Sequence, residues 1–149
     1  MNQHSSSPQP ALYLDDLTVG SLFVSGEHAM DEQQILAFAQ QFDPQPFHLS
    51  DAAARETLFG GLAAITMRLL VTSGMPLQGG IIGSGGELSW PRPTRASDIL
   101  HVESEVLEVT PSRSRPDRGM VKLRSETRNQ HGEIVQLFIS KLVVSRKTP

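Results

Sequence analysis

The side chains best suited to proton transfer lie in one short stretch, where Asp43 and His48 are five positions apart. Pro44 and Pro46 stiffen this stretch, because each proline fixes its own φ and pushes the preceding residue out of the helical region. A carboxylate and an imidazole held rigidly could share one water or substrate atom as an acid/base pair. The same residues also suit a turn opened by Asp-Pro with a packed histidine, so spacing alone leaves both interpretations open.

The run D-P-Q-P-F-H resembles the signature D-x-N-P-x-H of the MaoC-like dehydratases, also called R-specific enoyl-CoA hydratases. Gln45 stands where the family usually has asparagine, and both are neutral amides. An alanine-rich segment and Phe59-Gly60-Gly61 follow, and the resemblance extends over most of the chain from about Tyr13. It implies that Asp43 and His48 are the two catalytic residues.

The resemblance also implies an acyl thioester of coenzyme A as the substrate, with no cofactor other than the coenzyme A that the substrate carries. The residues expected to bind substrate are Phe47, Phe59, Gly60, Gly61, Leu62, Trp90 and Arg92. Two groups of arginines could attract the phosphates of coenzyme A, because guanidinium groups match phosphate geometry: Arg92 with Arg95, and the turn at 112–119 with Arg113, Arg115 and Arg118. That turn could equally be a solvated hairpin tip. His28, His101 and His131 are isolated in the sequence, so no metal site is expected.

One segment of the family pattern is missing. In that pattern a run like A-S-G-W-H-T follows Phe-Gly-Gly-Leu, whereas here Leu62 is followed directly by Ala63 and Ala64. Roughly seven residues are absent, which is about two helical turns, so the later part of the helix keeps its apolar face toward the sheet. The missing segment carries the glycine that resembles the family's oxyanion donor. We therefore expect Gly60 and Gly61 to open a shortened helix, with the N–H of Gly61 or Leu62 directed between Asp43 and His48.

Composition limits the remaining possibilities. A chain of 149 residues suits one domain, and residues 1–10 are polar enough to form a disordered arm before a single domain at 11–149. The chain has no cysteine and no apolar run of membrane-spanning length, which favours a cytoplasmic protein that does not enter membranes. A net charge of −3 argues against nucleic acid as a partner.

Periodicity predicts an α+β domain. We expect a strand at 21–27, a helix at 30–39, a buried central helix at 62–71 that is apolar nearly all round, a glycine-rich loop at 74–86, and strands at 98–109, 120–129 and 134–145. Gly132 should provide the positive φ of a hairpin turn at 129–132. The resemblance implies the hotdog fold, in which a curved antiparallel sheet wraps around one helix.

The function expected from this resemblance is that of a hydratase or dehydratase, a lyase that adds water to 2-enoyl-CoA or removes it from 3-hydroxyacyl-CoA. Two alternatives remain, a hotdog thioesterase that would not need His48, and a module that binds acyl thioesters without catalysis. A single curled sheet leaves an unpaired strand edge, so we expect a homodimer.

Overall fold

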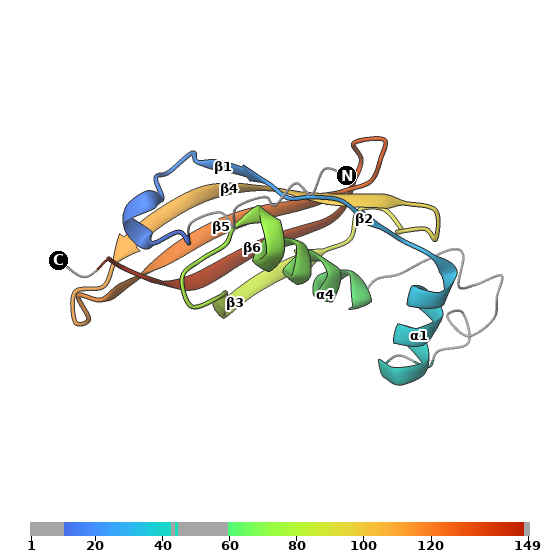
Figure 1. The fold of residues 1–149 in the computed structure, drawn as a ribbon, viewed down its shortest axis with the longest axis horizontal. Helices are drawn as coiled ribbons and strands as arrows, with labels where there is room; N and C mark the ends of the chain where they lie inside the picture. Colours follow the sequence, from blue (N-terminus) through green and yellow to red (C-terminus); the bar gives the residue numbers. More distant parts are fainter. Residues whose placement is uncertain (1–10, 43, 45–59, 148–149) are drawn as a thin grey trace, which may run out of the picture.

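A computed structural model describes residues 11–42, 44 and 60–147. Within these residues six strands form one antiparallel sheet (Figure 1): β1 (Leu22–Val24), β2 (His28–Ala29), β3 (Ile82–Ser89), β4 (Ile99–Pro111), β5 (Arg118–Arg128) and β6 (Ile134–Ser145). The helices of the described residues are the 3-10 turn η1 (Leu14–Asp16), α1 (Glu32–Phe42), α4 (Gly60–Leu69) and the π-helical turn η2 (Leu70–Gly74) that continues α4. The three long C-terminal strands and the hairpin turn, with Gly132 at φ 74°, confirm the sequence predictions.

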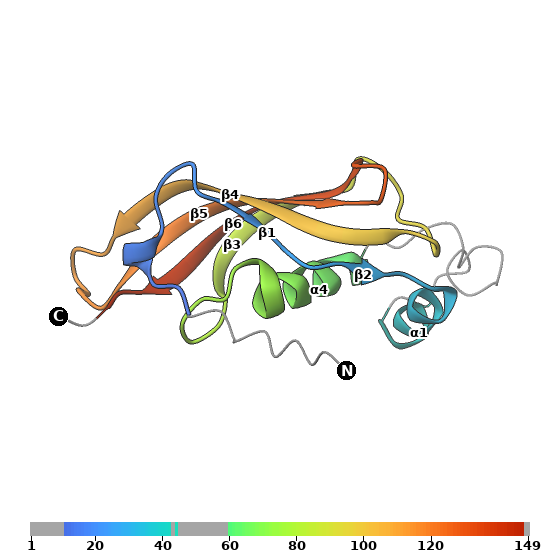
Figure 2. The same cartoon turned by 45° about the horizontal axis from the view of Figure 1, so that its top comes forward.

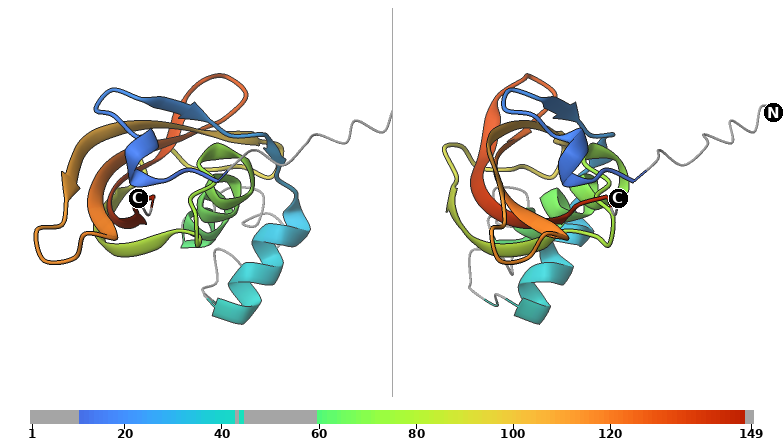
Figure 3. Two further views of the ribbon diagram at one scale, coloured as in Figure 1. Left: turned by 60° about the vertical axis from the view of Figure 1, so that its left-hand side comes forward. Right: turned by 90° about the vertical axis from the view of Figure 1, so that its left-hand side faces the viewer.

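The sheet has the strand order β1-β4-β5-β6-β3, with β2 pairing to β4. It curves around α4 (Figure 2), and the end-on views of Figure 3 show α1 projecting away from this body. β4 and β6 begin, and β3 and β5 end, at the same end of the sheet, because Ser89 pairs with Leu137 and His101 with Arg128. We call this the α1 end, since β2 pairs with the start of β4 and leads directly into α1.

Helix α1 begins at a well-formed cap. The carboxylate of Asp31 accepts the backbone N–H of Gln34 at 2.9 Å and its side-chain Nε2 at 2.9 Å. These hydrogen bonds lower the pKa of Asp31, because they favour the charged carboxylate, and the bond from the Gln34 side chain has the largest effect. The buried side chains of Ile35 and Ala39 hold the helix against the body. The helix expected at 30–39 is therefore confirmed, with its start at Glu32 and its end at Phe42.

Helix α4 is the central helix, and Gly60 opens it as expected. The expectation that this helix is buried is wrong for one face, because Met67 of α4 and Val71 of η2 are 37% and 46% exposed while the polar Thr66 is 1% exposed. One face of the helix packs on the sheet, and its side chains there include Leu62, Leu69 and Leu70. No described helix is both long enough and apolar enough to cross a membrane.

The loop expected at 74–86 is wrong in its second half, because β3 begins at Ile82. Strand β3 pairs with β6 along its length, with one irregularity between Gly83 and Gly85. Gly86 is needed for close packing: a Cβ there would lie 2.6 Å from the ring of Phe138 and 2.8 Å from the carbonyl oxygen of Ile139. Of the glycines that suggested a loop, Gly86 therefore allows β3 and β6 to approach closely.

Two apolar clusters fill the space between the sheet and α4. The larger includes Leu69, Val102, Val121 and Leu142, together with Leu14 and Leu17, which tie the segment before β1 to the body. The smaller lies at the α1 end and consists of Met30, Ile35, Leu62, Leu100 and Val135.

Candidate active site

The segment that carries the predicted acid/base pair lies between α1 and α4. Helix α1 ends at Phe42, directly before Asp43 in the sequence, and α4 begins at Gly60. Asp43, Phe47, His48 and Phe59 lie outside the described residues, as do residues 1–10, so their predicted roles stay predictions. The two helices are in contact with each other at the α1 end of the sheet, where Ile35 and Leu62 share one apolar cluster.

The first turn of α4 is anchored to the sheet by the side chain of Leu62. Leu62 is fully buried and packs in the cluster that contains Ile35, Leu100 and Val135. Burying a leucine of this kind is worth roughly 1.5–3 kcal/mol, which anchors the turn to the sheet. Leu62 therefore has only its backbone N–H to offer a substrate, and Gly61 likewise has no side chain.

The start of a helix suits a developing negative charge, because the first four N–H groups lack acceptors within the helix and the helix dipole is positive there. In α4 this turn begins at Gly60. The structure thus supplies a helix start at the position where we expected the oxyanion donor, whereas its orientation toward Asp43 and His48 stays a prediction.

A buried polar network, which the sequence did not predict, ties α4 to the sheet. The indole N–H of Trp90 donates to Oε1 of Gln136 at 3.0 Å, and Nε2 of Gln136 lies 2.9 Å from Oγ1 of Thr66. Thr66 and Thr127 share a hydroxyl hydrogen bond of 2.6 Å. Because the indole is only a donor, Oε1 of Gln136 accepts from Trp90 and Nε2 of Gln136 donates to Thr66, and either hydroxyl can be the donor in the Thr66–Thr127 hydrogen bond. Gln136 and Thr127 are fully buried.

A signal for this network was present in the strand pattern. The inward positions of β5 are odd-numbered, since Val121 and Leu123 are fully buried, and the same alternation places the polar Thr127 inward. Thr66 likewise interrupts an otherwise apolar run. The partner of Thr127 on β6 could not be predicted, because the register shifts between Thr127 and Arg128 and pairs Thr127 with Gln136.

The two remaining predicted binding residues, Trp90 and Arg92, follow directly after β3. Trp90 is 38% exposed, so its ring reaches the surface while the buried amide of Gln136 holds its N–H. Arg92 Nη1 forms an ion pair of 3.1 Å with Glu133 on the β5–β6 turn. The structure therefore places both at the α1 end, the end at which Gly61 and Leu62 begin α4.

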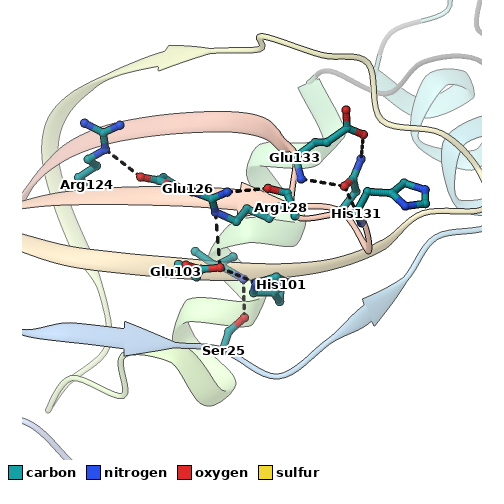
Figure 4. Close-up of polar contacts among 11 residues, drawn as sticks. Ser25, His101, Glu103, Arg124, Glu126, Arg128, His131 and Glu133 are labelled. Atoms are coloured by element: carbon teal, nitrogen blue, oxygen red, sulfur yellow. Dashed lines mark hydrogen bonds and ion pairs between the residues drawn. The ribbon is translucent and has the colours of Figure 1, made fainter.

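The face of the sheet turned away from α4 carries an ion network (Figure 4). Glu103 on β4 and Glu126 on β5 are directly opposite, and Arg128 forms ion pairs with both. Arg124 also pairs with Glu126, and Nε2 of His101 lies 2.8 Å from Glu103. These side chains offset two facing carboxylates, so we interpret the network as structural. Among the described residues no group of three or more potential ligands is placed to hold a metal ion.

A curved six-stranded sheet around one central helix, as found in the described residues, is the hotdog fold. Comparison with solved structures specifies the class further. The MaoC-like dehydratase from Rhodospirillum rubrum is 56% identical, with a TM-score of 0.86 and coverage of 93% of this chain and 100% of that one. The chain therefore belongs to the MaoC-like dehydratase family, which confirms the resemblance seen in the sequence.

Two more distant relatives are also similar over most of this chain. The R-hydratase PhaJ1 from Pseudomonas aeruginosa is 25% identical with a TM-score of 0.73, and the alignment covers 92% of this chain and 88% of PhaJ1. Protein YdeM from Bacillus subtilis is 28% identical in an alignment of 141 residues, with coverage of 88% of this chain and 96% of YdeM. No family model matches the sequence.

Proposed function

We propose that this protein adds water reversibly to 2-enoyl thioesters of coenzyme A to give 3-hydroxyacyl thioesters. The observation that carries the proposal is the 56% identity to a MaoC-like dehydratase over the whole length of that chain. The likeness to an R-hydratase supports hydration chemistry and R configuration of the product.

In the proposed mechanism, Asp43 and His48 hold one water molecule. One of them removes a proton as the water oxygen bonds to the β-carbon, the electron pair of the double bond moves toward the thioester carbonyl, and the other protonates the α-carbon. Negative charge on the thioester oxygen would be stabilised by the N–H groups that begin α4, at Gly61 or Leu62. Dehydration reverses the same steps.

The buried network supports this assignment of roles, because it fixes the position of α4. Thr66 lies just over one turn beyond Leu62 and is bonded to both β5 and β6 through Thr127 and Gln136. A helix held at this point cannot rotate or slide without breaking buried hydrogen bonds, so its first turn stays in place. Rigid placement is what an oxyanion donor requires.

We also propose that the protein is a homodimer joined through β3. This strand lies at one edge of the sheet, and all eight of its residues are exposed, among them Ile82 at 57% and Leu88 at 40%. An exposed edge strand presents unpaired backbone N–H and C=O groups and is normally covered in the functional state. Light scattering should therefore give the mass of a dimer at micromolar concentration, and a monomer would contradict the proposal.

The test of the proposed reaction follows two signals from the same 2-enoyl-CoA series. Hydration removes the absorbance of the conjugated enoyl thioester, whereas hydrolysis releases a free thiol, which a thiol reagent detects without background because the protein has no cysteine. Loss of absorbance without thiol release supports the hydratase. Thiol release would support the thioesterase alternative, and binding with neither signal would support a non-catalytic module.

A further inference from the structure

A hollow of about 360 Å³ opens at the α1 end of the sheet, between the 92–98 segment and the β5–β6 turn. Its lining includes Arg92, Arg95, Asp98, Gln130, His131 and Glu133. The volume falls within the range of about 300–1,000 Å³ that is typical of small-molecule sites. Figure 4 shows His131 and Glu133 on the turn that forms one side of it.

The carboxylates of this hollow are already engaged in holding its walls. Asp98, which is 6% exposed, accepts the backbone N–H of Arg95 at 2.8 Å and Nε2 of Gln130 at 3.3 Å. Gln130 in turn accepts the N–H of Ile99 at 3.0 Å. Glu133 accepts Nδ2 of Asn129 at 3.1 Å, which fixes the turn. The two walls are therefore linked before any ligand arrives.

The guanidinium groups, by contrast, keep most of their donors. An arginine carries five N–H donors, and the ion pair of Arg92 uses Nη1 toward Glu133, with the Arg92 side chain 57% exposed. The exposed Arg95 side chain has no ion pair or hydrogen bond with any other described residue. Two guanidinium groups with spare donors at one hollow suit a ligand with several anionic oxygens, and phosphate fits their fork geometry.

The position of the hollow separates it from the other arginine group. Arg113 and Arg115 lie beyond Pro111, at the opposite end of β4, and the thirteen residues of β4 span roughly 40 Å. The arm between the thiol and the first phosphate of coenzyme A has about as many bonds as four residues of peptide, so it spans roughly 15 Å. Of these two arginine groups in one subunit, the group at the hollow is the one that lies at the end of the sheet where α4 begins.

We propose that this hollow binds the phosphates of coenzyme A through Arg92 and Arg95, with His131 at its edge. The inference rests on the proposed function for the identity of the ligand. Coenzyme A is a better fit than an acidic carrier protein, because the site is a concave hollow of small-molecule size and not a broad surface.

The test measures binding of free coenzyme A, and of pantetheine as a ligand without phosphate, by calorimetry. In Arg92→Gln/Arg95→Gln we expect the Kd for coenzyme A to rise by about tenfold per arginine, whereas pantetheine binds as it does to the wild type. Arg113→Gln/Arg115→Gln removes the same charge at the other end of the sheet and should leave both Kd values unchanged. Arg95→Gln alone breaks no ion pair between described residues, so its effect cannot come from loss of the Arg92–Glu133 contact.

Turnover separates this inference from the proposed function. With an enoyl-CoA substrate the hollow variant should raise KM by a similar factor while kcat changes little. A wild type that binds coenzyme A through Arg92 and Arg95 without hydrating enoyl-CoA would refute the reaction and keep the site. An active enzyme whose KM is unchanged in Arg92→Gln/Arg95→Gln, or rises equally in Arg113→Gln/Arg115→Gln, would refute the site. The site would also be refuted if Arg92→Gln/Arg95→Gln weakened binding of an acyl carrier protein but not of coenzyme A.

Discussion

Replacing Gln136 tests the buried network that fixes α4. Gln136→Leu keeps a side chain of similar size but removes the acceptor for Trp90 Nε1 and the donor to Thr66 Oγ1. Thr66 stays paired with Thr127, and the indole of Trp90, at 38% exposure, can turn its N–H toward water. The loss should therefore lie in the lower part of the range for an orphaned buried group, at about 1–2 kcal/mol. For a domain of this size that lowers Tm by about 2–8 °C.

Gln136→Glu gives a second, pH-dependent measurement of the same site. Because residue 136 is fully buried, the site disfavours a charged carboxylate and raises the pKa of the introduced acid in the folded protein. A raised folded-state pKa means that stability is retained below the pKa of the unfolded chain and is lost as pH rises. The variant should match the wild type near pH 4 and lose up to about 1.4 kcal/mol per pH unit above that.

Both effects are measured by thermal and urea unfolding followed by far-UV circular dichroism. Tryptophan fluorescence is less suitable as the unfolding signal, because the emission of Trp90 would also change when its hydrogen bond is lost. Thr66→Val and the double variant with Gln136→Leu complete a thermodynamic cycle, in which we expect a coupling free energy of about 1 kcal/mol. Unchanged stability in Gln136→Leu, or a Gln136→Glu deficit that does not vary with pH, would refute the network as described.

Two further predictions concern β3 and α1. Gly86→Ala places a Cβ against Phe138 and should destabilise the fold by about 1–3 kcal/mol. Gly83→Ala is the control, because nothing lies within 4 Å of its added Cβ, and it should not destabilise the fold. Equal urea midpoints for the two variants would show that residues 82–86 are not a strand packed on β6. The bonds from Gln34 lower the pKa of Asp31 below that of the unfolded chain, so its stabilisation of α1 is present at neutral pH and is lost as pH falls through that lowered value. Carbon-detected NMR should find the Asp31 carboxyl titrating below 3.8, and a midpoint at or above it would contradict the cap.

Elements whose burial pattern is local were predictable from the sequence. β5 alternates buried and half-buried residues along its whole length, so its period of two was visible without knowledge of its neighbours. The acids and apolar spacing of α1 marked a helix in the same way. The candidate acid/base residues Asp43 and His48 were also local, because the motif that carries them is a continuous run of six residues.

Features that depend on pairing between distant segments could not be predicted. Six glycines between 74 and 86 favour a loop by composition, and only the approach of Phe138 and Ile139 explains why Gly86 suits a strand. The Thr66–Gln136 hydrogen bond joins residues 70 positions apart and depends on a shifted strand register. The hollow at Arg92 and Arg95 likewise needs the β5–β6 turn as its second wall.

The most direct test of the proposed reaction is the rate at which the wild type and two variants remove the absorbance of a 2-enoyl-CoA thioester. The wild type should consume the substrate without releasing thiol, and Asp43→Asn and His48→Ala should each lower kcat/KM by about 10²- to 10⁴-fold with Tm unchanged, because each removes one member of an acid/base pair. Near-normal turnover by either variant, or no turnover by the wild type over a range of acyl chain lengths, would contradict the account.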